Sequence, residues 1–243
     1  MNDGYIKYSQ NRVLQGIANL IQKLPTAAIK DSTIIGEAEL WSTYFDPILS
    51  VLGADPEKSV QFRWSNTSSP ESGSDKRPDA IISNVTQLEF NSALGFGEAK
   101  KVEKDCNTYG LCRDLLLLAI FTKNTIDINK LNASLSFQIH GFNISFFLTR
   151  LDQHGIYTMV EVGHLKSPKS IEELPSLVNL RNLKILLAIN DAFWRLCRPS
   201  KEPELINARY IKTPDFITDF TEGSKDKNRI CSIRLGEWWF PIA

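Results

Sequence analysis

The stretch LGFGEAK, residues 94–100, constrains the fold of this chain more than any other. Its apolar residues and glycines predict a buried β-strand, yet it also carries a carboxylate and an ammonium group two positions apart. Side chains alternate along a strand, so we expect two opposite faces, with Leu94, Phe96, Glu98 and Lys100 on one and Gly95, Gly97 and Ala99 on the other. The small residues would let a helix pack closely. Burying an unpaired charge is costly, so the charged pair is either a salt bridge or lies at the sheet edge, where a cation and a substrate complete it.

Asp79, in the preceding predicted strand PDAIIS (78–83), is the expected neighbour of Glu98. A hairpin would bring the two carboxyl groups together, although the stretch of about 18 residues between them is longer than a tight hairpin needs. Adjacent carboxylates repel each other, and a divalent cation removes that repulsion. Because Mg²⁺ accepts few carboxylates and keeps several waters, Asp79, Glu98 and the Ala99 carbonyl would supply most of a site. Lys100 would then orient and help deprotonate the attacking water, or stabilise charge at a phosphate.

Periodicity along the rest of the chain predicts an α/β fold. Helices are expected over 12–24, 36–53, 107–123 and 171–197, and strands over 60–64, 78–83, 94–100, 136–151 and 155–165. Pro47 is expected to kink or split its helix, the segment 66–76 predicts a mobile polar loop, and the tail 198–243 is expected to be irregular. This order indicates a mixed central sheet flanked by helices. No linker interrupts the 243 residues, so we expect a single domain, 1–243.

RPDA followed by GEAK resembles the signature of the PD-(D/E)XK nuclease superfamily, carried here by Pro78–Asp79 and Glu98–Ala99–Lys100. The resemblance implies a restriction-endonuclease-like αβββαβ core over about 34–147, with an added hairpin and a C-terminal helical and aromatic extension over about 171–243. It also implies a metal-dependent phosphodiesterase (nuclease) that uses Mg²⁺ or Mn²⁺ and leaves the phosphate on the 5′ side of its product. The stretch from QIHGFNISFF to YTMVEV is in addition similar to a family of fungal proteins without an assigned activity.

The superfamily often supplies a further glutamate from the first helix and a polar residue from the fourth strand. Glu37 shares helical spacing with the apolar residues that follow it, whereas Glu39 points away from them, so we favour Glu37 for completing the metal shell or holding its water. On the fourth strand, the resemblance implies that Gln138 borders the metal site.

Basic and aromatic residues around the signature are candidates for contacts with nucleic-acid phosphates. They are Arg77, Lys101, Lys104, Tyr109 and Arg113. For the four residues that follow the signature, the alternative is that they are ordinary solvated residues at the N-terminus of a helix. Arg77 is equally consistent with a role in capping the sheet. Three other basic segments, 166–169, 198–201 and 224–229, are more typical of a solvated surface.

Charge and composition limit the partners and the location. The 28 Lys and Arg residues balance 28 Asp and Glu residues, so any contact with DNA or RNA must come from a local basic patch. The sequence shows no signal peptide or membrane span, and its four cysteines form no CxxC pair. We therefore expect an intracellular protein, nuclear or cytoplasmic, with reduced thiols, no zinc site and no membrane partner. The resemblance also suggests a homodimer, because many related nucleases act as dimers.

Two other interpretations stay open. A nuclease-like scaffold without catalysis would serve as a nucleic-acid or protein interaction module, which the neutral charge favours and the intact set of Asp79, Glu98 and Lys100 disfavours. An α/β enzyme of another kind lacks support, because the sequence contains no GxGxxG, P-loop or GxSxG motif.

Overall fold

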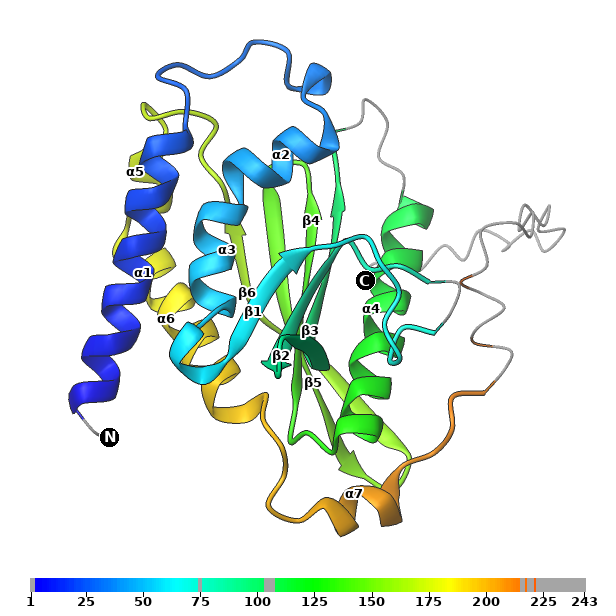
Figure 1. Ribbon diagram of the computed structural model, residues 1–243. Helices are drawn as coiled ribbons and strands as arrows, with labels where there is room; N and C mark the ends of the chain where they lie inside the picture. Colours follow the sequence, from blue (N-terminus) through cyan, green and yellow to red (C-terminus); the bar gives the residue numbers. More distant parts are fainter. Residues whose placement is uncertain (1–2, 74–75, 103–107, 215–216, 218–220, 222–243) are drawn as a thin grey trace, which may run out of the picture.

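The computed structural model describes residues 3–73, 76–102, 108–214, 217 and 221, with the backbone alone for 3–7. These residues form a six-stranded mixed β-sheet flanked by helices, which confirms the predicted α/β class (Figure 1). The strands are β1 (Val60–Trp64), β2 (Ala80–Thr86), β3 (Glu89–Lys100), β4 (Ser134–His140), β5 (Asn143–Gln153) and β6 (Ile156–Lys166). The helices are α1 (Asp3–Lys23), α2 (Glu37–Tyr44), α3 (Asp46–Gly53), α4 (Thr108–Asn129), α5 (Leu174–Leu177), α6 (Leu180–Leu196) and α7 (Pro203–Arg209), with short 3-10 turns η1 (Ser32–Ile34) and η2 (Pro56–Lys58).

The strands lie in the sheet in the order in which they occur along the chain. β3 and β4 are parallel, and all other neighbouring pairs are antiparallel. A parallel pair requires a crossover connection, which α4 provides between β3 and β4. β5 and β6 form the predicted hairpin. The stretch 136–151, predicted as one strand, is divided by a turn at Gly141 and Phe142 into the antiparallel strands β4 and β5. Apart from this division, the predicted order of helix, three strands, helix, strand, hairpin and helix is confirmed.

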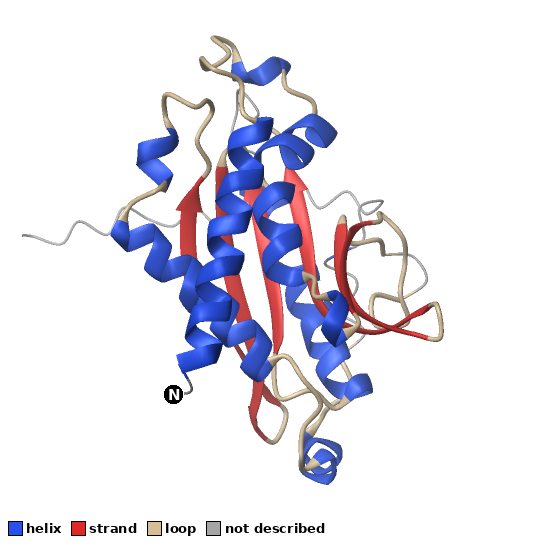
Figure 2. Cartoon of the chain, turned by 60° about the vertical axis from the view of Figure 1, so that its left-hand side comes forward, coloured by secondary structure: helices blue, strands red, loops and turns tan. Residues whose placement is uncertain are grey.

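The helices cover the two faces of the sheet unequally. α3 and α6 pack on one face, and α1 packs on these two helices as an outer layer (Figure 2). α4 packs on the opposite face, across β3, β4 and β5. This second face is called the α4 face below, and it carries the charged residues of β3.

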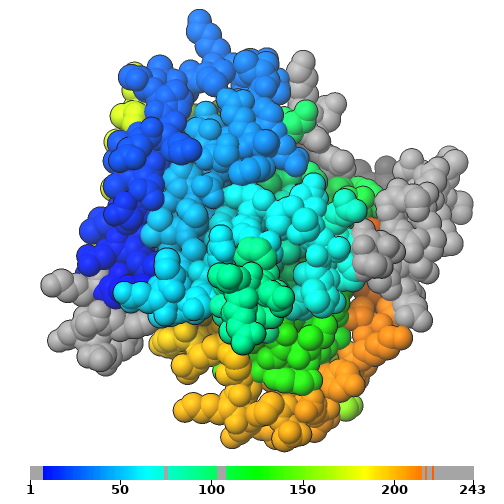
Figure 3. Space-filling model, viewed as in Figure 1, coloured from blue at the N-terminus to red at the C-terminus, as the bar shows by residue number. Residues whose placement is uncertain are grey.

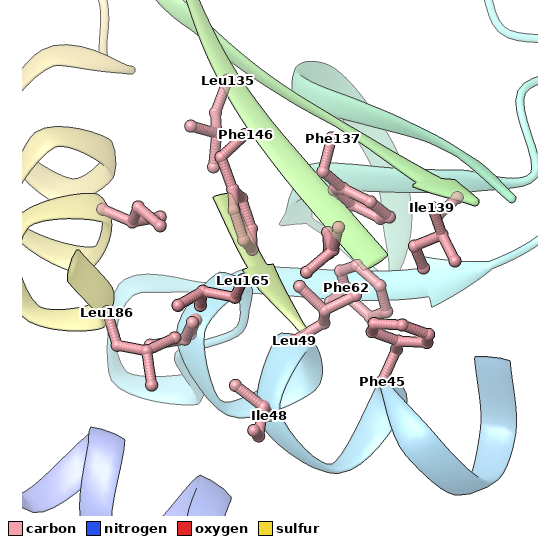
Figure 4. Close-up of a cluster of buried hydrophobic side chains, with 14 of the residues drawn as sticks. Phe45, Ile48, Leu49, Phe62, Leu135, Phe137, Ile139, Phe146, Leu165 and Leu186 are labelled. Atoms are coloured by element: carbon pink, nitrogen blue, oxygen red, sulfur yellow. The ribbon is translucent and has the colours of Figure 1, made fainter. Parts of the chain in front are cut away.

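Most of the apolar core lies between the sheet and the helices α3 and α6 (Figure 4). Phe137 lies near its centre, with its ring 6.2 Å from that of Phe146. Trp64 packs beside this core, stacks on Trp41 at 4.6 Å and donates a hydrogen bond to Asp46 at 2.9 Å. A smaller cluster fills the α4 face and consists of Ile81, Ala93, Phe96, Leu118 and Phe121.

Two predicted helices are each divided in the structure. The helix expected over 36–53 breaks at Phe45 into α2 and α3, because Pro47 lacks an N–H donor and fits the first turn of a new helix. The helix expected over 171–197 breaks at Val178 and Asn179 into α5 and α6. The Asn179 side chain accepts a hydrogen bond from the Asn182 N–H, which caps α6 at its own N-terminus.

The β2–β3 hairpin explains the long separation between Asp79 and Glu98. Both strands extend well beyond the predicted ranges and are joined by a tight turn at Gln87 and Leu88, which both have positive φ angles. The tip of this hairpin stands out on the surface in Figure 3, where it is drawn in green. The intervening residues are therefore paired strand, and Asp79 and Glu98 lie at the open end of the hairpin.

A β-bulge in β3 changes which face its first residues occupy. The register between β2 and β3 shifts around Ser83, so that Ser83 pairs with Ala93 while Ile82 pairs with Gly95. Leu94 consequently belongs to the larger core cluster, and the prediction that it shares the face of Phe96 is wrong.

The small residues of β3 make room for the neighbouring strand, and not for a helix as predicted. Gly97 pairs with Phe137 on β4, and a Cβ atom at Gly97 would lie 2.0 Å from the Phe137 ring. A Cβ atom at Gly95 would lie 2.6 Å from the carbonyl oxygen of Leu135. Glycine is therefore required at both positions by close approach of β4.

The segment 66–76, which the sequence predicts to be a mobile loop, is anchored where it is described. Glu71 is only 3% exposed. Its Oε1 atom accepts hydrogen bonds from the Ala93 N–H at 3.1 Å and the Asn129 side chain at 2.8 Å. The Glu71 carbonyl also accepts a hydrogen bond from the Asn124 side chain at 2.9 Å. The loop therefore lies against α4 and β3 before it leads to Asp79.

The C-terminal region is less irregular than predicted in its first part, because α7 forms there. The aromatic cluster 238–240 and the basic segment 224–229 lie outside the described residues. Among the residues that are described, no helix combines the length and the apolar character needed to cross a bilayer.

Candidate functional site

The signature residues meet at the end of the sheet where β2 begins and β3 ends. Asp79 immediately precedes β2, and the pairing of Ala80 with Gly97 sets Asp79 opposite Glu98. The Oδ2 atom of Asp79 accepts a hydrogen bond from the Ala99 N–H at 2.8 Å. The hairpin thus brings together the two carboxyl groups that the sequence analysis paired.

Glu98 is a buried acid whose ionisation is suppressed. It is 6% exposed, and its pKa lies well above the usual value near 4.5, chiefly because burial penalises the charged form. The negative charges of Asp79 and Asp114 and a hydrogen bond with Asp79 raise this pKa further, whereas the Lys100 ammonium group lowers it. Glu98 therefore resists ionisation unless another cation approaches it.

Lys100 lies among carboxylates at the end of β3. Its Nζ atom is 3.4 Å from Oδ2 of Asp114, on α4. Burial by itself would lower the pKa of Lys100, but the surrounding negative charges outweigh burial and raise it. Those charges are on Asp114, Glu98, Asp79 and Glu37. Lys100 is consequently held as an ammonium ion.

Asp114 is a site residue that the sequence analysis missed. Asp114 is 1% exposed. Burial raises its pKa, whereas the nearby positive charges of Lys100 and Arg113 lower it. A signal for it exists in the sequence. Asp114, Leu118 and Phe121 recur at helical spacing, and the last two belong to the apolar cluster under α4. An acid on the apolar face of a helix needs a partner of opposite charge, which Lys100 supplies.

Glu37 is the first residue of α2 and lies within electrostatic reach of the signature residues. Burial raises its pKa, Lys100 lowers it, and the charges of Asp79 and Asp114 raise it again. Glu37 is half-buried, whereas Glu39 is exposed, which agrees with the face predicted for each.

The oxygen ligands at this end of the sheet suit a hard divalent cation. Proteins usually bind Mg²⁺ through one or two carboxylates plus substrate phosphates, and Asp79 and Glu98 match that pattern. Among the described residues, no group of three or more His, Cys, Asp or Glu side chains is placed to hold a metal ion. A role for Glu37 in completing the metal shell or holding its water stays a prediction. The remaining ligands would be the Ala99 carbonyl, water and phosphate.

Gln138 borders the site from β4, where it pairs with Glu98. Its Nε2 atom donates a hydrogen bond to the Leu111 carbonyl at 2.8 Å. The Gln138 amide group thus fixes the first turns of α4 to the sheet beside Glu98.

The five candidates for phosphate contacts differ in their surroundings. Arg77 and Lys101 are exposed next to the two halves of the signature, and Tyr109 is exposed in the first turn of α4. Arg113 is half-buried and lies 3.6 Å from Asp114. Lys104 lies outside the described residues.

Comparisons with known proteins do not assign the chain to a family. No protein-family model, curated protein sequence or solved structure matches it. The resemblance to PD-(D/E)XK nucleases therefore depends on the two short motifs RPDA and GEAK, and any function must be argued from the geometry above.

The raised pKa of Glu98 predicts how stability depends on pH. Above the usual value near 4.5 and up to its folded-state pKa, the folded protein holds more protons than the unfolded chain, so its free energy of unfolding falls as pH rises. The raised pKa values of Asp114 and Glu37 act in the same direction. We expect Glu98→Gln to flatten this decline, measured by urea unfolding without metal between about pH 5 and about pH 8.

The matched control for that experiment is Glu172→Gln, because Glu172 is an exposed glutamate away from the site. It should retain the wild-type dependence on pH. Equal slopes for wild type and Glu98→Gln would contradict the suppressed ionisation of Glu98.

Proposed function

We propose that the chain is a metal-dependent phosphodiesterase that hydrolyses nucleic acid on a PD-(D/E)XK-type core. The observation that carries the proposal is the convergence of Asp79, Glu98 and Lys100 at one end of the sheet, around the 2.8 Å hydrogen bond from the Ala99 N–H to Asp79. The order of elements from α2 to β4, helix, three strands, helix and strand, supports the αβββαβ core.

Each residue of the site has a role in this proposal. A divalent cation bound there supplies Lewis acidity and a nucleophilic water at neutral pH. Asp79 and Glu98 hold the cation, and Glu37 holds a water beside it. Because Lys100 is kept as an ammonium ion, it suits orienting the water and stabilising charge at the phosphate better than removing a proton. Asp114 acts through Lys100 as a positioning residue.

A catalytically inactive scaffold that binds nucleic acid or protein is the second candidate. The observation that favours it is the ion pair between Lys100 and the buried Asp114, since a buried charge pair of this kind also occurs as a purely structural feature. In this case the same residues would stabilise the end of the sheet, and their replacement would change stability alone.

The test is cleavage of labelled single-stranded and double-stranded DNA and RNA, by wild type and by Asp79→Asn, with Mg²⁺ or Mn²⁺. We expect wild type to cleave one of these substrates, EDTA to stop the cleavage, and Asp79→Asn to abolish it at unchanged melting temperature. The preferred substrate then gives the class of nuclease. Equal trace cleavage by both proteins would overturn the proposal and favour the scaffold.

A further inference from the structure

The α4 face of the sheet carries polar side chains in two rows that begin at the candidate site. Residues paired on neighbouring strands face the same side of a sheet, so the register of β3 to β6 defines each row. The first row is Glu98, Gln138, Ser145 and His164. The second row, two residues further along, is Lys100, His140, Asn143 and Lys166. These eight residues are called the polar rows below.

The one acidic residue of the polar rows, Glu98, lies on β3, and the other strands supply polar side chains and the cation Lys166. Ser145 Oγ and His164 Nδ1 are 2.9 Å apart and form a hydrogen bond. Asn143, His164 and Lys166 are exposed. Within the described part of the chain, no carboxylate lies within ion-pair distance of Lys166. The far end of the rows thus suits an anion.

The polar rows lead from the site across β4, β5 and β6. On the other side of β3, the loop before Asp79 is anchored by the hydrogen bonds of Glu71 to Ala93 and Asn129, toward the end of the α4 face opposite the site. On β4, Gln138 is bonded to the Leu111 carbonyl of α4, whereas Asn143, His164 and Lys166 on β5 and β6 are exposed among the described residues.

We propose that the polar rows form the binding track for one strand of nucleic acid, which runs across β4, β5 and β6 away from the cleaved phosphate. This inference rests on the proposed function and specifies how its substrate is held. Neighbouring strands are about 4.8 Å apart, so β3 and β6 are about 14 Å apart. That distance corresponds to a few nucleotides of one strand. Lys166 then contacts a phosphate a few nucleotides from the one beside Lys100.

A nucleic-acid strand fits the polar rows better than a compact anion does. The rows extend in one direction, and a linear polyanion can use donors spaced along that direction. Because the whole chain has no net charge, a local track of this kind is needed for affinity.

The test is binding of fluorescein-labelled oligonucleotides of two to twelve nucleotides in EDTA, where cleavage is stopped. Lys166→Ala is compared with Lys184→Ala, an exposed lysine on α6, which packs on the opposite face of the sheet. For wild type, affinity should rise with length until the strand reaches β6. In Lys166→Ala, affinity should stop rising at a shorter oligonucleotide length than in wild type. The slope of log affinity against log salt should also become shallower by about 0.7, the value for one single-strand phosphate contact. Lys184→Ala should match wild type.

Failure of the track and failure of the proposed function are distinguishable. Cleavage by wild type combined with equal binding by Lys166→Ala and Lys184→Ala would overturn the track and leave the nuclease. Binding that depends on Lys166 without cleavage in any metal would overturn the nuclease and support the track. An absence of oligonucleotide binding by wild type would overturn the track. Because Lys166 is exposed, its replacement should leave the melting temperature unchanged.

Discussion

Lys100→Ala is expected to lower the single-turnover rate of nucleic-acid cleavage by about 10²–10⁴-fold. The ammonium group lies within the electrostatic field of Asp79, Glu98, Glu37 and Asp114, where it can orient water and hold charge that develops on the phosphate. Removal of the Lys100 side chain leaves these carboxyl groups without their ammonium partner. It also leaves the transition state without the positive charge that would stabilise the phosphate. The rate is measured with saturating enzyme and Mn²⁺, so that a change in substrate affinity does not affect the result.

The matched control is Lys123→Ala, which removes another ion pair of α4, between Lys123 and Asp127 at 2.7 Å. It should leave the cleavage rate unchanged, because this pair lies away from the signature residues. Asp114→Asn should lower the rate partially, and Asp114→Glu should recover part of the loss. Full activity in Lys100→Ala would show that the Lys100–Asp114 pair is structural.

Gly97→Ala is expected to lower the free energy of unfolding by about 3 kcal/mol. A Cβ atom at this position would lie 2.0 Å from the Phe137 ring, which is 1% exposed and packed among other aromatic rings. The ring cannot turn away without disturbing the core, so β3 and β4 must separate. Urea unfolding monitored by tryptophan fluorescence measures the loss.

Phe137→Leu provides the second half of a double-mutant cycle. In that background Gly97→Ala should cost less, with a coupling energy of at least about 1 kcal/mol, because the obstructing ring is gone. Gly36→Ala is the control, since no atom lies within 4 Å of a Cβ at Gly36. If Gly97→Ala were as stable as Gly36→Ala, the close packing of β4 on β3 would be wrong.

Much of the fold follows from local patterns in the sequence. Alternation of apolar residues located the strands, except that β4 and β5 were predicted as one, and the position of Pro47 pointed to the division between α2 and α3. The bulge at Leu94 was not predictable, because it depends on how β2 and β3 pair across the hairpin. The anchoring of Glu71 was missed for a similar reason, since its partners Ala93 and Asn129 lie far along the chain.

The candidate site was predictable where residues lie on strands and less so where they lie on helices. Strand alternation and a hairpin sufficed to place Asp79 beside Glu98, and helical spacing separated Glu37 from Glu39. Asp114 required knowing which face of α4 meets the end of β3, and that depends on the crossover from β3 to β4. Gln138 was expected to border the site, but its hydrogen bond to α4 depends on the same packing.

In the proposed function, Asp79 and Glu98 together hold a divalent cation, and titration with Mn²⁺ measures this binding. Free Mn²⁺ gives an electron paramagnetic resonance signal that bound Mn²⁺ loses, so binding is measured without any substrate. We expect wild type and Glu172→Gln each to bind a single Mn²⁺ ion per chain, and Asp79→Asn and Glu98→Gln to bind none. Equal binding by all four proteins, or no binding by wild type, would contradict it.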